Sequence, residues 1–225
     1  MKRFAVIPAG GRGTRLGGNI PKQFLKINSK EIIAYTLDIF DNCRLIDEIA
    51  VAVSPEYFKT MENIIAKYSF KKKIIIAEGG KERQDSVFSA ISALNPNPED
   101  IICVHDAARP FLSNEILKKA IKAADKKGSA IVAIKSRDTL LNAENSIVTG
   151  YVNRENVYYV QTPQISKFLI FSKAIKKAKK DNFLGTDESI LLFRTGEKVI
   201  IIDGDISNFK ITTQSDLVIA EKLLK

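Results

Sequence analysis

Residues 8–18 are the first stretch of the sequence whose residue types could do chemistry, because five glycines fall within nine residues there. Glycine has no Cβ, so the backbone of such a loop can approach a ligand closely and point its amide hydrogens at phosphate oxygens. Arg12 and Arg15 lie in this loop, and Lys22 follows seven residues after Arg15. Three cations beside a glycine loop suit a triphosphate, since they stabilise the charge that builds up during phosphoryl transfer.

The glycine loop matches neither of two common phosphate-binding motifs. It is not the P-loop, because no Gly-Lys-Ser or Gly-Lys-Thr follows it. It does not fit the dinucleotide fingerprint, since residues 11–16 have no third glycine in register. A flexible turn would explain the glycines alone equally well, so the neighbouring cations carry the prediction of a phosphate site.

A second candidate lies at the end of the apolar run at residues 101–105. Asp106 follows the run directly, and a carboxylate just past a buried strand is well placed to hold Mg²⁺ or a hydroxyl group. The alternative is a turn or helix-capping aspartate. His105 is the only histidine, and in an apolar strand it is predicted to be a core residue with one hydrogen bond. Without a second histidine or an activated serine, a catalytic triad has no support.

Three further segments carry polar residues, and the first two of them follow predicted strands. Gly80 would let the backbone reach a base or ribose, and Ser86 could hydrogen-bond there, although a plain turn is the alternative. Lys210 could meet a phosphate or lie on the surface. Residues 186–189 could merely cap a helix.

The elements that must position these residues can be recognised from apolar periodicity. Runs rich in Val and Ile recur without polar alternation, which indicates strands buried on both faces of a parallel sheet. The predicted strands are residues 4–8, 49–53, 74–77, 101–105, 130–134 and 199–202. Segments of helical periodicity lie between them, so the chain is predicted to form an α/β fold: a Rossmann-like three-layer sandwich with a mostly parallel central sheet.

Helix start signals agree with this alternation. Ser54 precedes a proline and is predicted to cap a helix. Thr213 and Asp216 resemble a capping box before a final helix at residues 217–224.

Residues 136–164 break the alternation, because they contain no good helix. Turn-prone residues separate two apolar stretches, which predicts a β-arm inserted at residues 136–160. Such an arm would expose apolar surface unless it packs on a partner. Its apolar residues are Leu140, Leu141, Tyr151, Tyr158 and Tyr159.

Composition bounds the remaining possibilities. With 225 residues, 45% of them apolar and 27% charged, the chain suits a single domain over residues 1–225 and excludes disorder, collagen and disulfide-dense mini-proteins. No apolar run approaches the roughly 18 residues that span a bilayer. The N-terminal run is too short for a secretory signal, which predicts a cytoplasmic protein with no membrane partner. Cys43 and Cys103 are predicted to be reduced core thiols.

The net charge of +9, from 35 basic and 26 acidic residues, could attract nucleic acid or serve phosphorylated small molecules. The lysines are scattered except for two groups, Lys71-Lys72-Lys73 and Lys176, Lys177, Lys179 and Lys180, which are read as solvated surface. The sequence has no zinc-spaced cysteines or histidines and no aromatic RNA-binding signature. We therefore predict no nucleic-acid partner. A non-catalytic nucleotide-binding or nucleic-acid-binding protein remains the alternative of another class.

Taken together, the ordered motifs resemble one family, the 2-C-methyl-D-erythritol 4-phosphate cytidylyltransferases of the non-mevalonate isoprenoid pathway. The resemblance runs from Phe4 to the last helix. The most specific motifs are Pro21-Lys22-Gln23-Phe24, Arg83-Gln84-Asp85-Ser86-Val87, His105-Asp106-Ala107-Ala108-Arg109-Pro110, Arg137-Asp138-Thr139, Thr162-Pro163-Gln164, Thr186-Asp187-Glu188 and Asn208-Phe209-Lys210-Ile211-Thr212.

The resemblance implies transfer of CMP from CTP to a sugar-alcohol phosphate, with Mg²⁺ and release of pyrophosphate. Arg15 and Lys22 would be catalytic and stabilise the pentacoordinate phosphorus. Asp106 would bind the metal or the ribose. The nucleotide-binding residues would be Ala9, Gly10, Gly11, Gly13, Gly80, Ser86 and Asp106. The residues that bind the sugar phosphate would be Arg109, Thr139, Arg154, Thr162, Thr186 and Lys210, of which Thr139 and Arg154 would reach the neighbouring subunit's site in a homodimer.

Two points qualify what the resemblance implies. The loop has Ala9-Gly10-Gly11 followed by Gly13-Thr14-Arg15, and a Gly-Gly loop with Gly-Thr-Arg also resembles the ribitol 5-phosphate cytidylyltransferases. The ribitol acceptor therefore stays open as an alternative. The predicted acceptor is 2-C-methyl-D-erythritol 4-phosphate, because other motifs look closer to the methylerythritol enzymes: Asp85-Ser86, Ala108, Arg137-Asp138-Thr139 and Thr186-Asp187-Glu188. A phosphate monoester is already an anionic nucleophile at neutral pH, so the lack of a histidine base is expected.

Overall fold

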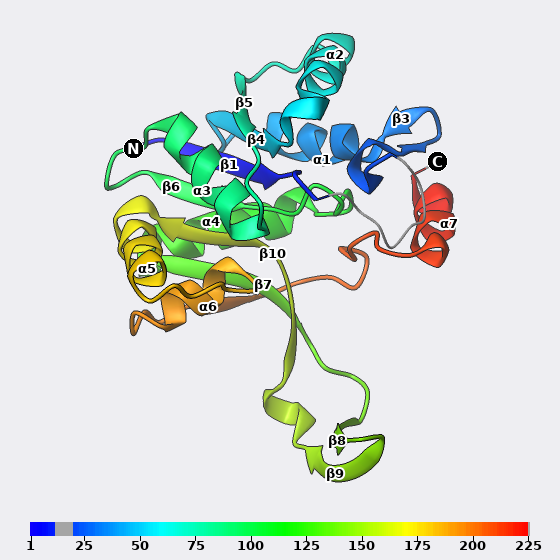
Figure 1. The fold of residues 1–225 in the computed structure, drawn as a ribbon, viewed down its shortest axis with the longest axis vertical. Helices are drawn as coiled ribbons and strands as arrows, with labels where there is room; N and C mark the ends of the chain where they lie inside the picture. The colour runs from blue at the N-terminus through cyan, green and yellow to red at the C-terminus, as the bar shows by residue number, and fades with distance from the viewer. Residues whose placement is uncertain (12–19, 225) are drawn as a thin grey trace.

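A computed structural model describes residues 1–11 and 20–224, and within them seven strands form one sheet in the order β11–β7–β10–β6–β1–β4–β5 (Figure 1). These strands are β1 (Arg3–Pro8), β4 (Glu48–Val53), β5 (Ile74–Glu78), β6 (Ile101–Val104), β7 (Ser129–Lys135), β10 (Tyr158–Lys167) and β11 (Ile200–Asp203). The α-helices are α1 (Ile32–Asp41), α2 (Phe58–Tyr68), α3 (Arg83–Leu94), α4 (Asn114–Lys127), α5 (Phe168–Lys180), α6 (Glu188–Phe193) and α7 (Gln214–Leu223). The short elements are η2 (Lys22–Phe24), β2 (Lys26–Ile27), β3 (Lys30–Glu31), η3 (Pro55–Tyr57) and η4 (Arg154–Asn156).

The sheet is buried on both faces, as its uninterrupted apolar strands predict. Successive side chains of a strand point to opposite faces. In β1, Ala5 and Ile7 join one core cluster with α1, α2 and α4, while Phe4 and Val6 join a second with α3, α5 and α6. The predicted three-layer α/β sandwich is therefore confirmed. All strand pairs of this sheet are parallel except those of β10.

The sequence did not predict β10 as a strand of the central sheet. The predicted β-arm ends at residue 160, but β10 continues to Lys167 and pairs antiparallel with both β6 and β7. The strand cannot be recognised from apolar periodicity, because the polar and proline residues at 161–164 interrupt the apolar run. The pairing register shifts between Val160 and Gln164, where Pro163 has no N–H to donate to a ladder. The consequence for the site is that β10 brings Thr162 beside Asp106.

The two predicted helix starts differ in outcome. The capping box before α7 is confirmed, since Thr213 and Asp216 each accept the other's backbone N–H. The prediction for Ser54 is wrong. Its hydroxyl makes no cap hydrogen bond and instead donates to the carbonyl of Gly10, 3.2 Å away. Pro55 begins the 3₁₀ turn η3 without a side-chain cap.

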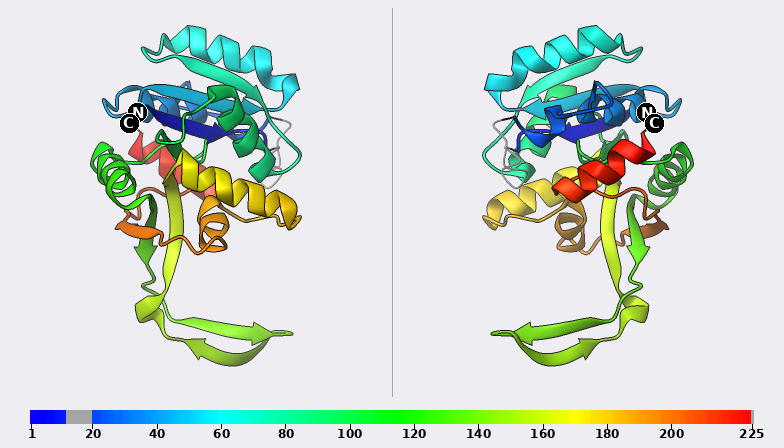
Figure 2. Two further views of the ribbon diagram at one scale, coloured as in Figure 1. Left: turned by 90° about the vertical axis from the view of Figure 1, so that its left-hand side faces the viewer. Right: turned by 90° about the vertical axis from the view of Figure 1, so that its right-hand side faces the viewer.

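Between β7 and β10 the chain forms a hairpin of β8 (Leu140–Glu144) and β9 (Ile147–Val152), which projects away from the body (Figures 1 and 2). Large apolar side chains on it are exposed, among them Ile147 at 69% and Tyr151 at 73%. The structure thus has the arm that the sequence predicts at residues 136–160. Leu140 and Tyr158, expected to be exposed with it, are half-buried at the arm's base.

Candidate active site

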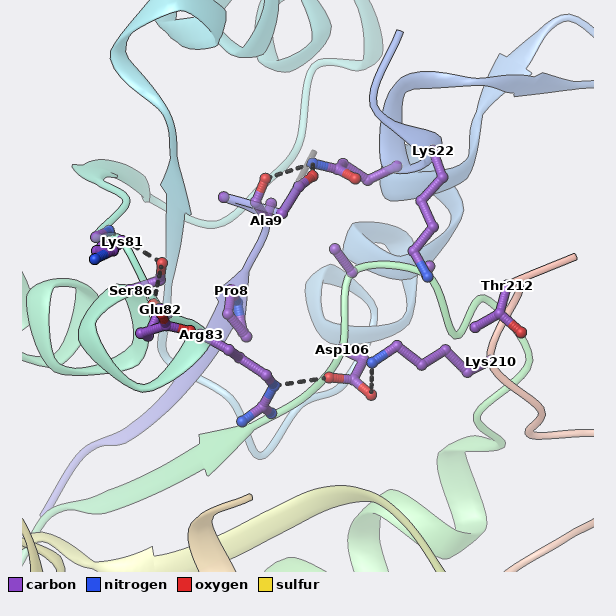
Figure 3. Close-up of a pocket in the computed structure, with 16 residues that line it drawn as sticks. Pro8, Ala9, Lys22, Lys81, Glu82, Arg83, Ser86, Asp106, Lys210 and Thr212 are labelled. Carbon is purple, nitrogen blue, oxygen red and sulfur yellow. Dashed lines mark hydrogen bonds and ion pairs between the residues drawn. The ribbon is translucent and has the colours of Figure 1, made fainter. Parts of the chain in front are cut away.

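A cavity of about 320 Å³ opens where β1, β5 and β6 end (Figure 3). The carboxyl ends of parallel strands form the edge where ligands bind in open α/β sheets. Three segments that follow these strands line it, together with residues near η2 and near the start of α7. The lining residues are Pro8, Ala9, Gly10, Gly11, Lys22, Gln23, Gly80, Lys81, Glu82, Arg83, Ser86, Asp106, Ala107, Ala108, Lys210 and Thr212.

This cavity brings together most of the residues that the sequence assigns to the nucleotide and to catalysis. The predicted residues present are Ala9, Gly10, Gly11, Lys22, Gly80, Ser86 and Asp106. Arg15 and Gly13 lie outside the described residues, so their predicted roles remain predictions. Figure 3 shows Lys22 pointing from η2 toward Asp106 and Lys210, and its ammonium donates to the carbonyl of Ile211 at 2.8 Å.

The end of β1 is held by side chains that hydrogen-bond to its carbonyls. Gln23, buried beside Lys22, donates its amide to the carbonyls of Ala9 and Gly11. Ser54 donates to Gly10 from the other side. These bonds fix η2 relative to the loop, so they also fix the root of Lys22. The sequence motif that contains Lys22 includes Gln23, but nothing in it showed which backbone groups the amide would meet.

The loop after β5 packs tightly against the end of β1. A Cβ on Gly10 would lie 3.0 Å from the hydroxyl oxygen of Ser86, and one on Gly79 would lie 3.3 Å from the Cα of Gly10. The N–H of Gly80 donates to the Ser86 hydroxyl at 3.1 Å. Glycine is needed here because two backbone segments come within contact distance of each other.

Replacing Gly80 with alanine is expected to weaken binding of CTP, the nucleotide that the resemblance implies, by roughly tenfold or more and to lower the melting temperature. The new Cβ would lie 2.2 Å from the Cβ of Asp85, and backbone atoms of Asp85 lie within 3.3 Å as well, so the loop must shift. Calorimetric titration with CTP and thermal unfolding would measure both effects. Gly11→Ala is the stability control, because its Cβ would meet no atom of residues 1–11 and 20–224 within 4 Å. An unchanged CTP affinity in Gly80→Ala would contradict the packing argument.

Asp106 is a buried carboxylate at the centre of an ion cluster whose cations are partly exposed. One carboxylate oxygen accepts from Nε of Arg83 at 3.2 Å, and the other accepts from Nε of Arg109 at 3.2 Å and from Nζ of Lys210 at 3.1 Å. Burial alone raises the pKa of this carboxyl, but Lys210, Arg83 and Arg109 outweigh burial and hold that pKa well below its usual range. Asp106 therefore stays ionised and keeps three cations at one place.

A second cavity, of about 220 Å³, adjoins the first. It contains four residues that the sequence assigns to the sugar phosphate: Arg109, Thr162, Thr186 and Lys210. Three residues, Arg83, Asp106 and Lys210, line both cavities. The ion cluster therefore stands at the boundary between the two, where a group passing from one ligand to another would have to be.

The other two predicted acceptor residues lie on the arm side of the molecule. Thr139 and Arg154 are exposed, and neither lines the two cavities of this chain. Arg154 donates to the carbonyl of Arg137 at 2.9 Å. Their place at the base of the hairpin leaves them on the segment that projects from the body.

His105 makes two hydrogen bonds rather than the predicted one. Its Nε2 lies 3.0 Å from the carbonyl oxygen of Arg109, which can only accept, so Nε2 carries the proton. Nδ1, 2.9 Å from the hydroxyl of Thr162, must then accept. Burial lowers the pKa of His105 to about 4, which keeps the ring neutral at pH 7. The expectation that His105 is not a base agrees with its full engagement.

This tautomer fixes the role of the Thr162 hydroxyl. Its proton goes to His105, and its oxygen accepts the backbone N–H of Asp106 at 3.2 Å. A phosphate dianion offers only acceptors, so Thr162 would have to leave His105 in order to donate to one. The hydroxyl as placed can accept from a substrate hydroxyl group and holds the turn that carries Asp106.

The residues of the cluster do not fit a metal ion held by the protein alone. Asp106 has both oxygens on cations already, and the described parts of the chain contain no group of three or more His, Cys, Asp or Glu that could hold a metal. Mg²⁺ prefers an octahedron of oxygens. The Mg²⁺ predicted at Asp106 therefore remains a prediction.

Comparison with known proteins points to one family. A family model described as "IspD: 2-C-methyl-D-erythritol 4-phosphate cytidylyltransferase" matches residues 4–225. A 2-C-methyl-D-erythritol 4-phosphate cytidylyltransferase of Geotalea uraniireducens is 38% identical and covers 100% of this chain and 97% of its own length. The protein of the same name from Clostridium acetobutylicum is 41% identical, with coverage of 98% and 96%.

Solved structures show the same likeness. The crystal structure of 4-diphosphocytidyl-2C-methyl-D-erythritol synthase from Anaerococcus prevotii superposes with a TM-score of 0.86 and 32% identity, over 99% of this chain and 96% of that one. The fold, the ordered motifs and the full-length relatives agree, and the chain belongs to the 2-C-methyl-D-erythritol 4-phosphate cytidylyltransferase family.

Proposed function

We propose that this chain transfers CMP from CTP to 2-C-methyl-D-erythritol 4-phosphate and releases pyrophosphate. The observation that carries the proposal is that Arg83, Asp106 and Lys210 line both cavities. A nucleotide in the larger cavity and a phosphorylated acceptor in the smaller one would bring their phosphates together at one ion cluster, as transfer between them requires. Membership of the family supports the identity of both substrates.

The reaction needs charge and positioning more than proton transfer. An oxygen of the acceptor's phosphate attacks the α-phosphorus of CTP, and the bond from that phosphorus to the pyrophosphate oxygen breaks. The attacking phosphate is already anionic, so no general base is required, in keeping with a neutral, fully engaged His105. The obstacle is repulsion between two anions, which Lys22, Lys210 and Arg109 would reduce.

The acceptor is tested by measuring pyrophosphate release with CTP and either 2-C-methyl-D-erythritol 4-phosphate or ribitol 5-phosphate. The relatives' names favour the methylerythritol acceptor over the ribitol alternative. We expect turnover with the first acceptor and little with the second. Turnover with ribitol phosphate alone would overturn the acceptor, and release with neither acceptor would overturn the function.

Mg²⁺ is proposed to bind together with CTP, as part of the nucleotide substrate. Metal–nucleotide complexes take most of their ligands from phosphates and water, and few from protein carboxylates. This is compatible with a cluster whose single carboxylate, Asp106, is already paired with cations.

We propose that the chain acts in the cytoplasm and has no nucleic-acid partner. Cys43 and Cys103 are buried free thiols, as suits a reducing compartment. Among residues 1–11 and 20–224, no helix has the length and apolar character needed to cross a membrane. Positive charge concentrated at the two cavities suits small phosphorylated substrates.

We also propose a homodimer in which the arm of one subunit reaches the other's site. The exposed Leu141, Ile147 and Tyr151 would be covered in such a dimer. Thr139 and Arg154, at the arm's base, would complete the partner's acceptor cavity. The single-domain body with an inserted arm is the arrangement that this proposal requires.

Mixing two inactive variants is expected to restore activity if the arm is shared. In a mixed dimer of Lys22→Ala and Arg154→Ala subunits, one site would combine an intact Lys22 with an intact Arg154 from the neighbour. Light scattering would establish the dimer, and pyrophosphate release would be compared before and after mixing. If the mixture is no more active than the separate variants, Arg154 serves its own subunit or none.

A further inference from the structure

We propose that Glu188 is a positioning residue that holds Arg83 against Asp106 at the boundary between the two cavities. This rests on the proposed function, because it concerns the ion cluster at which the two phosphates would meet. Glu188 does not line either cavity, so it acts through Arg83 rather than on a substrate.

The first step is the pairing of Glu188 with Arg83. The Glu188 carboxylate, buried to 3% exposure, accepts from both terminal nitrogens of Arg83, at 2.6 and 3.1 Å. This is the bidentate arrangement in which a guanidinium and a carboxylate fix each other's plane. Because the guanidinium is planar, fixing its two terminal nitrogens also fixes the direction of the third nitrogen, Nε.

The second step is what that third nitrogen meets. Nε of Arg83 donates to Asp106 at 3.2 Å, on the carboxylate oxygen that neither Arg109 nor Lys210 uses. The orientation of Arg83 therefore decides whether this oxygen is paired. If Arg83 did not pair with this oxygen, the Asp106 carboxylate could rotate while keeping its contacts with Arg109 and Lys210. That rotation would move Lys210, which lines both cavities.

The third step is that Glu188 is itself held from two sides. The segment before α6 is fixed by Gln84, whose side-chain oxygen Oε1 accepts the N–H of Gly185 at 2.9 Å. The start of α6 is fixed by Gln164, whose side-chain oxygen Oε1 accepts the N–H of Ser189 at 2.7 Å. The support for Glu188 thus comes from α3 and from β10, the two elements that also carry Arg83 and Thr162.

A buried ion pair is weak evidence for stability, since desolvating both charges offsets much of their attraction. Burial raises the pKa of Glu188, and Arg83 works against that rise. The Glu188–Arg83 pair carries a desolvation cost and directs Nε of Arg83 at Asp106. A role in positioning Arg83 explains this pair better than a role in stability. A purely structural role predicts loss of stability without a specific effect on Asp106, so the two explanations can be separated.

The test is a double-mutant cycle of Glu188→Gln and Asp106→Asn, read out as kcat/KM for 2-C-methyl-D-erythritol 4-phosphate. Glutamine has the same shape but places an amide donor against the guanidinium, so Arg83 should turn away. We expect Glu188→Gln to lower kcat/KM by roughly 10- to 100-fold, and the double variant to be no worse than Asp106→Asn alone. Effects that multiply would overturn the proposal.

A spectroscopic readout keeps this test separate from the activity itself. In ¹H–¹⁵N spectra, the Nε–H signal of Arg83 is expected to move in Glu188→Gln toward its position in Asp106→Asn; an unmoved signal would overturn the proposal. Glu31→Gln is the matched control, because Glu31 is also a buried, ion-paired glutamate but lines neither cavity. It should leave that signal and kcat/KM unchanged. If the unmodified protein showed no turnover, the proposed function would be overturned. The Nε–H signal of Arg83 would still test whether Glu188 positions Arg83.

Discussion

Replacing Lys22 with alanine is expected to lower kcat by roughly 10²- to 10³-fold while changing CTP affinity only a few-fold. Lys22 enters the larger cavity from η2, on the side opposite Ser86, and points toward Asp106 and Lys210 (Figure 3). A charge placed beside the reacting phosphorus matters most when negative charge builds up in the transition state. The measurement combines steady-state kinetics with calorimetric titration of CTP.

The matched control for this variant is Lys119→Ala. It removes the same charge from an exposed position on α4, outside both cavities, so it tests whether net charge alone explains the effect. Its kinetics should match those of the unmodified protein. If Lys22→Ala weakened CTP binding by the same factor as it lowered kcat, Lys22 would bind the ground state, and its catalytic assignment would be wrong.

Replacing Lys210 with methionine is expected to lower kcat/KM for the acceptor by roughly 10²-fold. The ammonium of Lys210 lies 3.1 Å from Asp106 and borders both cavities. Methionine keeps the unbranched apolar stem but removes the charge that would meet the acceptor's phosphate. Asp106 would also lose the largest of the charges that lower its pKa, so that pKa should rise.

Lys210→Arg separates these effects, because it keeps the charge but changes the geometry of the donors. We expect it to recover much of the activity lost in Lys210→Met. Steady-state kinetics with varied acceptor at saturating CTP would measure this. An acceptor kcat/KM that stays within threefold of the unmodified value in Lys210→Met would exclude Lys210 from the acceptor's phosphate.

The sequence predicts the fold well where apolar residues alone decide it. Uninterrupted runs such as residues 49–53 have one stable place, between two layers of helices, so the six predicted strands lie within two residues of those observed. The sequence does not predict β10, because this strand contains Thr162 and Gln164, polar residues that line the smaller cavity. A strand whose residues serve the cavities lacks the pattern by which strands are recognised.

Some residues of the candidate site can likewise be predicted from sequence, and others cannot. Residues that follow strands, such as Asp106 and Gly80, can be placed from sequence, because the ends of parallel strands share one edge. Pairings between distant segments cannot. Glu188 lies in a quoted motif, yet only the folded chain shows that it meets Arg83, 105 positions earlier. The two hydrogen bonds of His105 likewise depend on tertiary structure, since one partner, Thr162, comes from β10.

The central claim is that positive charge is gathered around the α-phosphorus of a bound nucleotide. A crystal structure with CTP tests it most directly. The account predicts that CTP fills the larger cavity with its base near Gly80 and Ser86, and with the α-phosphate within about 3 Å of the Lys22 ammonium and next to the Asp106–Lys210 pair. A triphosphate bound elsewhere, with Lys22 still on the carbonyl of Ile211, would contradict it.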